Sequence, residues 1–181
     1  MIFYDFKYLI ISFHISIDSY NVLFIILYLE LKMSDNVVHM KLEGSSKSHS
    51  RTDILTRDVE SVIDEPIVRG GTNLGLSPTE TLVSSLIGCT NVITHRIMEK
   101  MGFKIDKLDI KTKTLFNKDG ASIVQEVDIP FPEINMDIEI STDASKSDLI
   151  EVKKQLAMYC PIAKVIRNSG TIINENWTKV N

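Results

Sequence analysis

The chain has 181 residues and a net charge of −4, with a pI of about 5.6 and 24% charged residues. This length suits one domain with a substantial core, and the composition is that of an ordinary globular protein. The sequence has no concentrated basic region, which argues against nucleic-acid binding. Two cysteines are too few for a secreted disulfide framework or a four-ligand zinc site. We therefore expect a reducing, cytoplasmic location and no metal.

The N-terminal residues 1–32 differ from the rest of the chain because they are rich in Ile, Phe, Tyr and Leu. Residues 8–31 form a stretch long enough to cross a bilayer. Three polar residues interrupt this stretch, namely His14, Asp18 and Asn21. An acidic residue near the middle of a lone spanning helix costs about 3 kcal/mol. We expect residues 1–32 to be an extension outside the fold, with a membrane anchor as the alternative, and residues 33–181 to form one domain.

Three short strands are predicted before the first helix. They cover residues 37–43, 51–57 and 59–63, and a polar turn is expected over residues 44–50. The next segment, residues 64–77, contains one proline and three glycines. These residues predict a loop with a defined conformation rather than a flexible linker.

A long helix is predicted after this loop. Ser77 can cap it, Pro78 suits the first helical position, and Glu80 completes a capping box. Apolar residues then recur at helical spacing, at Leu82, Leu86, Cys89, Ile93 and Ile97. Gly102 is a typical helix end. The pattern predicts an amphipathic helix that carries Cys89 on its buried side.

The second half of the chain predicts strands over residues 105–115, 122–129 and 134–140. A helix over residues 143–158 follows, with Ser145 and Asp148 as its capping pair. Pro161 interrupts this helix or starts a short one that ends at Gly170. A closing strand is predicted over residues 171–177. Strands grouped before and between helices indicate an α+β fold.

The two cysteines allow both a structural and a chemical interpretation. Cys89 is either a small buried hydrophobe or a reactive thiol, and a reactive thiol needs a cation or dipole that stabilises the thiolate. Arginine suits that role because it stays charged when desolvated. Three arginines upstream are candidates, namely Arg51, Arg57 and Arg69. Cys160 precedes Pro161 at a predicted helix start, where it either caps the helix or is favoured as a thiolate.

Other polar residues give weaker signals. Glu80 either completes the helix cap or orients an arginine that serves Cys89, since both residues lie on the same predicted helix. His95 lies on a different helical face from Cys89, which argues against a metal pair. His39 and His49 have no acidic or thiol companions at ligand spacing. We therefore expect no metal and no organic cofactor.

The loop and the helix start, residues 64–80, together with residues 86–90, resemble the OsmC/Ohr family of osmotically inducible and organic-hydroperoxide-resistance proteins. Residues 159–161 (Tyr-Cys-Pro) and 175–177 (Glu-Asn-Trp) extend the resemblance, which covers the chain from about residue 37 onward. The resemblance implies an α+β fold in which antiparallel sheets pack around a long central cysteine-bearing helix. It also implies an intertwined homodimer with thiol sites at the subunit interface.

The same resemblance implies a function and roles for individual residues. The expected activity is thiol-dependent reduction of organic hydroperoxides in oxidative-stress defence, with a lipoyl or small-thiol dithiol as reductant. Cys89 matches the peroxidatic cysteine and Cys160 the resolving cysteine. Arg51 is the best match for the arginine that activates the thiol, and Arg69 is the second choice. Glu80 is the candidate for the acid that orients this arginine.

The acidic residue marks a departure from the family pattern. In the characterised organic-hydroperoxide branch the orienting glutamate directly follows the proline, whereas this chain has Thr79 there and Glu80 one position later. One helical step rotates a side chain by about 100°, so the arrangement of arginine and glutamate must differ. The alternative function is therefore a dimeric, non-peroxidase module of the same fold that senses redox state or binds a small ligand.

Overall fold

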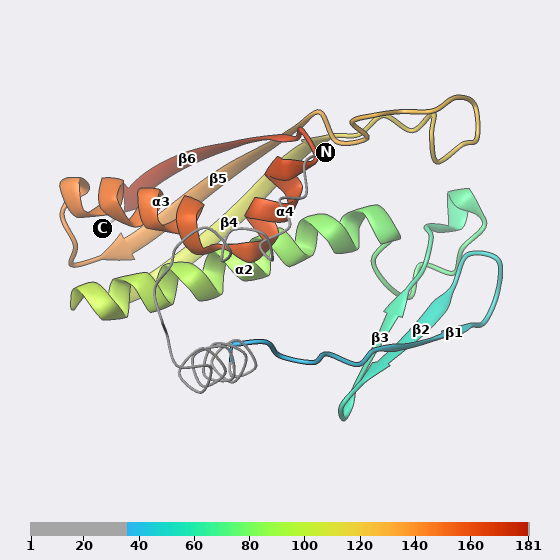
Figure 1. Ribbon diagram of the computed structural model, residues 1–181, viewed down its shortest axis with the longest axis horizontal. Helices are drawn as coiled ribbons and strands as arrows, with labels where there is room; N and C mark the ends of the chain where they lie inside the picture. Colours follow the sequence, from blue (N-terminus) through green and yellow to red (C-terminus); the bar gives the residue numbers. More distant parts are fainter. Residues whose placement is uncertain (1–35, 181) are drawn as a thin grey trace, which may run out of the picture. The chain divides into compact units, whose positions relative to one another are not determined.

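The structure is a computed structural model that describes residues 36–180. The chain divides into two compact units, residues 1–43 and 44–181. In the first unit, residues 36–42 are exposed and lie outside strands and helices. The predicted extension, residues 1–32, lies outside the described residues. The second unit holds the secondary structure that positions the cysteines (Figure 1).

The first sheet contains three strands in the order β1 (Glu43–Ser46), β2 (Thr52–Thr56) and β3 (Val59–Ile63). Strands β2 and β3 are antiparallel and bracket a tight turn in which Arg57 has a φ of 55°. The strand predicted over residues 37–43 is wrong. The turn between β1 and β2 is closed by the Lys47 N–H, which donates to the Arg51 carbonyl at 2.9 Å. Because of this closure, β1 covers residues 43–46, most of which were expected to form a turn.

A loop with a defined conformation follows β3, as predicted. It contains a short 3₁₀ helix, η2 (Ile67–Arg69), and two glycines whose backbone is tightly packed. A Cβ atom on Gly71 would lie 1.7 Å from the Glu65 carbonyl oxygen, and one on Gly75 would lie 1.9 Å from that of Val62. Only glycine fits at these two positions without moving the backbone.

Helix α2 (Pro78–Met101) has both of the predicted ends. Ser77 and Glu80 form the capping box, and Gly102 ends the helix with a φ of 84°. The buried side chains of α2 are Leu86, Thr90, Thr94, Ile97 and Met98. The buried face is therefore turned slightly from the predicted stripe, and it leaves Cys89 half-buried at its margin.

The second sheet has the order β4 (Ile105–Leu115), β5 (Glu133–Thr142) and β6 (Ile172–Val180). Strands β4 and β5 are antiparallel, but β6 runs parallel to β5, so this sheet is mixed and not antiparallel as expected. The reason is the connection, since two helices lie between β5 and β6 and return the chain to the start of the sheet.

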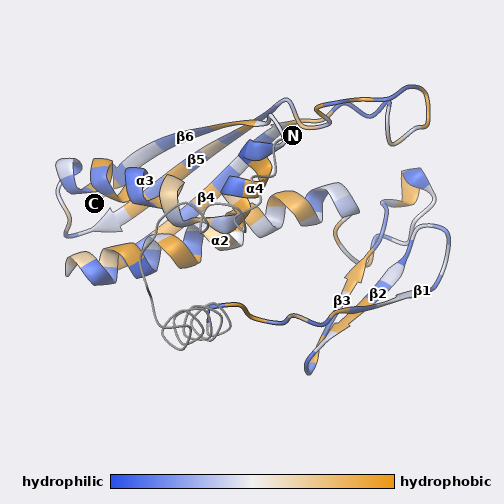
Figure 2. Cartoon of the chain, in the orientation of Figure 1, coloured by the Kyte–Doolittle hydropathy of each residue, from blue (hydrophilic) through white to orange (hydrophobic). Residues whose placement is uncertain are grey.

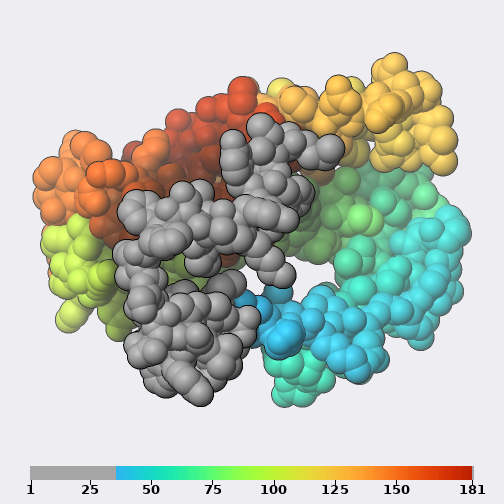
Figure 3. Space-filling model, in the orientation of Figure 1, coloured from blue at the N-terminus to red at the C-terminus, as the bar shows by residue number. Residues whose placement is uncertain are grey.

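The strand predicted over residues 122–129 is wrong. Residues 116–132 form a loop (the golden lobe in Figure 3), in which Ile123 has a φ of 57° and is 94% exposed. Strand β4 pairs directly with β5, and the Asn117 N–H closes the loop on the Pro130 carbonyl at 2.9 Å. The segment pairs with no strand of either sheet and stays in the loop, although its apolar residues follow a strand-like pattern.

The core lies between the second sheet and the helices. Alternate residues of β5 are fully buried, namely Ile134, Met136, Ile138 and Ile140. Helices α3 (Lys146–Tyr159) and α4 (Pro161–Asn168) contribute buried residues, as does α2. Apolar and polar residues are interspersed along all three helices, as Figure 2 shows. Each helix therefore buries one face and exposes the other.

Candidate thiol site

The two cysteines, 71 positions apart in sequence, lie side by side. Helix α2 carries Cys89, and Cys160 lies at the junction where α3 ends and α4 begins. The Cys160 thiol donates to the Cys89 sulfur, and the two sulfurs are 2.7 Å apart. Both cysteines are free thiols. Since a disulfide bond is about 2.05 Å long, only a small side-chain movement would be needed to join them.

The local sequence explains why Cys160 occupies this junction. A residue before proline is held in an extended conformation, and Cys160 has φ −71° and ψ 107°. Pro161 then starts α4 at the first helical position, where its missing N–H costs nothing. The Ala163 N–H donates to the Cys160 sulfur at 3.4 Å, so the thiol itself caps α4. The sequence Cys-Pro therefore ends one helix, begins the next and fixes the sulfur between them.

The two thiols differ in exposure. Cys160 is 0% exposed, whereas Cys89 is half-buried. Burial raises the pKa of Cys160 to about 11, and its hydrogen bond to Cys89 adds to this effect. The Ala163 N–H acts in the opposite direction, but desolvation outweighs it. The sequence-based interpretation in which the helix start favours a thiolate at Cys160 is therefore wrong, and Cys160 is a neutral hydrogen-bond donor at pH 7.

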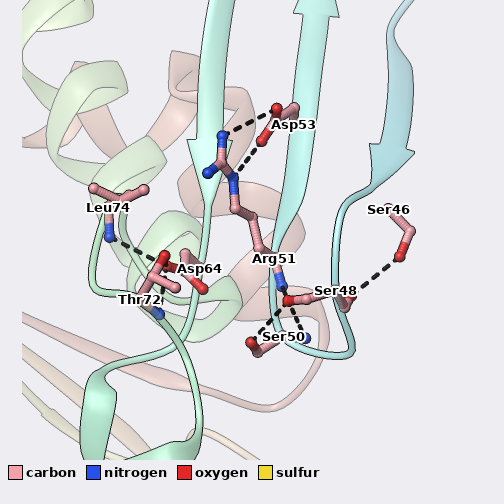
Figure 4. A network of polar contacts seen from close by, with 8 residues as sticks. All are labelled: Ser46, Ser48, Ser50, Arg51, Asp53, Asp64, Thr72 and Leu74. Carbon is pink, nitrogen blue, oxygen red and sulfur yellow. Dashed lines mark hydrogen bonds and ion pairs between the residues drawn. The ribbon is translucent and has the colours of Figure 1, made fainter.

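Arg51 directly precedes β2 and is held by a carboxylate. Its Nε and Nη2 atoms donate to the two carboxylate oxygens of Asp53 at 2.7 and 3.1 Å (Figure 4). This two-point contact raises the pKa of Arg51 and lowers that of Asp53. Over residues 36–180, Arg51 has no hydrogen bond or ion pair with either cysteine. The structure thus shows Arg51 oriented by Asp53, in a single chain.

Glu80 is engaged in the cap of α2. Its Oε2 atom accepts from the Ser77 N–H at 2.8 Å and from the Ser77 hydroxyl at 2.9 Å. These hydrogen bonds hold the pKa of Glu80 below its usual value, with the Ser77 N–H as the largest cause. Arg69, the second candidate arginine, pairs instead with Glu65 at 2.6 Å. Of the four site residues predicted from sequence, the structure therefore brings Cys89 and Cys160 together and places Arg51 and Glu80 in other contacts.

Two acidic residues near the first sheet were missed by the sequence analysis. Asp53 could have been found, because residues two apart on a strand share a face and it lies two positions after Arg51. Asp64 is fully buried and its Oδ2 atom accepts from the Thr72 N–H and hydroxyl and from the Leu74 N–H, at 2.9, 2.6 and 3.1 Å (Figure 4). These bonds, the Thr72 hydroxyl foremost, lower the pKa of Asp64 and tie the loop to the end of β3.

Between residues 36 and 180, no group of three or more His, Cys, Asp or Glu side chains is arranged to hold a metal ion. None of the helices in the described part of the chain is long and apolar enough to cross a membrane.

Comparison with known proteins identifies the family. Residues 71–175 match the family model described as OsmC-like protein. This match covers more than half of the chain and includes both cysteines, so the chain belongs to the OsmC-like family. The comparison with curated proteins found no significant match.

Solved structures share the fold at low sequence identity. The OsmC-like protein of Mycoplasma pneumoniae has a TM-score of 0.68 and 19% identity, over 80% of this chain and 99% of that chain. An organic hydroperoxide resistance protein OsmC of Legionella pneumophila has a TM-score of 0.55 and 7% identity, over 80% and 98%. The organic hydroperoxide resistance protein OhrB of Bacillus subtilis has a TM-score of 0.52 and 14% identity, over 78% and 98%. At these identities the likeness establishes the α+β fold of the family.

Proposed function

We propose that this protein is a cytoplasmic thiol-dependent peroxidase that reduces organic hydroperoxides in oxidative-stress defence. The observation that carries the proposal is the pair of free thiols 2.7 Å apart, one half-buried and one fully buried. Two members of the same fold that are named for organic hydroperoxide resistance support it. Each cycle would consume one hydroperoxide and one external dithiol and would return the two cysteines to their thiol form.

The first step takes place at Cys89, the more exposed of the two thiols. Its thiolate attacks the terminal oxygen of the hydroperoxide, the O–O bond breaks, and the alkoxide leaves as an alcohol after taking up a proton. Cys89 is thereby oxidised to a sulfenic acid. The Cys160 thiol supports this step, because a hydrogen bond donated to the Cys89 sulfur stabilises negative charge there.

The second step joins the two cysteines. The Cys160 sulfur attacks the sulfur of the Cys89 sulfenic acid, an S–S bond forms, and the hydroxyl leaves as water with the proton of Cys160. The burial of Cys160 protects it from direct oxidation until Cys89 has reacted. An external dithiol then reduces the disulfide by thiol–disulfide exchange, becomes a disulfide itself and returns its two protons to the cysteines.

Arg51 requires a second subunit to act on the thiols. Strands β2 and β3 pack mainly with one another, whereas α2 packs with α3, α4 and β4 of its own chain. Exposed apolar side chains lie on the first sheet and the following loop, at Leu55, Val59, Leu74 and Leu76. Their exposure favours an intertwined homodimer that covers them. In such a dimer, Arg51 would meet a thiol pair at the subunit interface.

Asp53 takes the place of the orienting glutamate in this proposal. Position 79, which directly follows the proline, is threonine, and Glu80 is engaged in the cap of α2. Asp53 already holds one edge of the Arg51 guanidinium, which donates two hydrogen bonds to its carboxylate. The chain can therefore orient Arg51 without an acid at position 79.

The alternative is a dimeric module of this fold that senses redox state or binds a small ligand without peroxidase turnover. The engagement of Glu80 in the helix cap favours it, because the family's pairing of arginine and glutamate is then absent from the described contacts of residues 36–180. Turnover separates the two functions. A peroxidase consumes many equivalents of hydroperoxide when dithiol is supplied, whereas a sensor is oxidised once and reacts slowly.

The test follows cumene hydroperoxide consumption by the full-length reduced protein in the presence of dihydrolipoamide. We expect multiple turnovers that Cys89→Ser abolishes. Cys160→Ser should still be oxidised at Cys89 and should accumulate a sulfenic acid that dimedone traps. Consumption at the rate of the buffer alone, with Cys89 remaining reactive toward iodoacetamide, would exclude the peroxidase and leave the alternative.

A further inference from the structure

A groove far from the cysteines runs between α3 and the edge strand β6. It contains a pocket of about 420 Å³, within the range of about 300–1,000 Å³ that is usual for small-molecule sites. Its lining combines three lysines with three apolar side chains, namely Lys146, Lys153, Lys179, Leu149, Ile150 and Trp177. About 15 Å of helix separates Ile150 from Cys160 at 1.5 Å per residue, so the pocket is not part of the thiol site.

The lysines place three positive charges around the pocket. Lys153 donates to the Glu175 carbonyl at 2.8 Å and Lys179 donates to the Ala144 carbonyl at 2.6 Å. Each ammonium group has three N–H donors, so each keeps two for another acceptor. Within the described part of the chain, none of the three lysines forms an ion pair with a carboxylate.

The nearby acids are engaged elsewhere. Asp148, whose charge interacts with Lys179, accepts from the N–H and hydroxyl of Ser145 in the cap of α3. The Glu175 side chain is only 6% exposed, and it pairs with Arg167 at 2.7 Å and accepts from the Trp177 indole N–H at 3.2 Å. Their carboxylates are therefore committed to structural contacts, and the ammonium groups of the pocket remain available to an anion.

Part of the pocket lining is apolar. The indole N–H of Trp177 is satisfied by Glu175, so its ring presents an apolar surface to the groove. Ile150 also lines the pocket and is 72% exposed. The aliphatic stems of the lysines can add to the apolar surface. The lining thus combines apolar side chains with ammonium groups.

We propose that this groove binds an amphipathic carboxylate, a free medium-chain fatty-acid anion. The carboxylate would accept hydrogen bonds from the lysine ammonium groups, and the alkyl chain would lie along Trp177, Leu149 and Ile150. The ligand therefore matches the pocket in two ways, with its negative charge near the lysines and its alkyl chain on the apolar side chains. This binding site is independent of the cysteines and does not rest on the proposed peroxidase activity.

The single tryptophan of the chain gives a direct measurement, since Trp177 lines the pocket. Decanoate, kept below its micellar concentration, is titrated into the full-length protein while the tryptophan emission is recorded. We expect a saturable change, with butanoate at least tenfold weaker because it lacks the alkyl contact, and decanol at least tenfold weaker because it lacks the charge. Lys146→Gln and Lys153→Gln should each weaken decanoate binding several-fold.

Lys154→Gln is the matched control, because Lys154 lies on the same helix but does not line this pocket. Circular dichroism melting confirms that each variant is folded. A linear, unsaturable response to decanoate would overturn the proposal. Equal weakening by Lys154→Gln, or equal binding of butanoate and decanoate, would show general anion attraction and would overturn it as well. Tighter binding of anionic phospholipid vesicles than of decanoate would also overturn the proposal, and would indicate that the groove binds a membrane surface.

Discussion

Cys160 and Cys89 have opposite surroundings although their sulfurs are in contact. Cys160 is sealed between two helices, and its pKa is raised to about 11, chiefly by desolvation. Cys89 lies at the margin of the buried face of α2 and is half-buried. A reagent from solvent therefore meets Cys89 first, and the buried thiol can react only with the sulfur beside it. The difference between the two sites assigns the order of events in the proposed cycle.

The raised pKa of Cys160 predicts a loss of stability in alkaline solution. In the unfolded chain the thiol ionises near its ordinary pKa of 9.0, whereas in the folded chain it holds its proton to about pH 11. Between these values the folded state binds more protons, so the free energy of unfolding falls as pH rises, by on the order of 2 kcal/mol. Urea titrations of reduced protein at pH 8 and pH 10.5 measure the fall. In Cys160→Ala the fall should be smaller, and an equal fall in both proteins would contradict the assignment.

Asp53 predicts a second effect at the scale of single residues. Asp53→Asn removes the charge that orients Arg51, so we expect the rate constant of Cys89 with cumene hydroperoxide to fall about tenfold, equivalent to about 1.4 kcal/mol. Asp53→Glu, which keeps the charge, should restore part of the rate. Asp109→Asn is the matched control, since Asp109 forms the same kind of ion pair two residues from Lys107 on β4. An unchanged rate constant in Asp53→Asn would show that Asp53 has no role in the reaction.

At the scale of elements, the N-terminus of α2 joins the loop to the cysteine helix. The capping box was predictable because its residues are local in sequence, and the structure confirms it with both reciprocal hydrogen bonds. The role of Glu80 was not decidable, since a helix cap and an orienting acid use the same residue type. The structure resolves the contact in one chain in favour of the cap, because both hydrogen bonds to Ser77 converge on one carboxylate oxygen.

Glu80→Ala separates the two roles. If Glu80 serves the cap, the substitution should lower the free energy of unfolding by about 1 kcal/mol and leave the rate of Cys89 oxidation unchanged. Asp148→Ala is the matched control, because Asp148 occupies the same position in the capping box of α3. Thermal melting and stopped-flow oxidation of the same samples give both quantities. A large fall in the oxidation rate of Glu80→Ala, but not of Asp148→Ala, would show that Glu80 orients the arginine.

At the scale of the whole molecule, prediction from sequence succeeded where the determinants are local. Strand β3 and both ends of α2 follow from turn residues and caps close in the chain. The segment 122–129 has the pattern of a strand but lies in the loop between two strands, β4 and β5, that pair with each other instead. The parallel direction of β6 and the contact of two cysteines 71 positions apart also depend on how distant elements pack. Periodicity and capping carry no information about such contacts.

The proposed homodimer predicts that one active site takes residues from two chains. Arg51→Ala lacks the arginine and Cys89→Ser lacks the reacting thiol, so each variant alone should be nearly inactive. Co-expression of the two should form mixed dimers in which one site has both residues, and peroxidase activity should return. The negative control is co-expression of Cys89→Ser with the double variant Cys89→Ser/Cys160→Ala, because neither chain then carries the reacting thiol. Activity that stays absent in mixed dimers, when mass spectrometry shows that they form, would show that Arg51 does not act on the thiols of the other subunit.

In the proposed cycle, Cys89 and Cys160 act together as a two-cysteine peroxidase. Intact-mass spectrometry of the reduced full-length protein, after one equivalent of cumene hydroperoxide, tests this pairing. The parent should rapidly lose two hydrogens as the disulfide forms, Cys160→Ser should gain one oxygen, and Cys89→Ser should stay unchanged. If the parent keeps its mass for many minutes while iodoacetamide still labels Cys89, the two thiols are adjacent but do not reduce hydroperoxides.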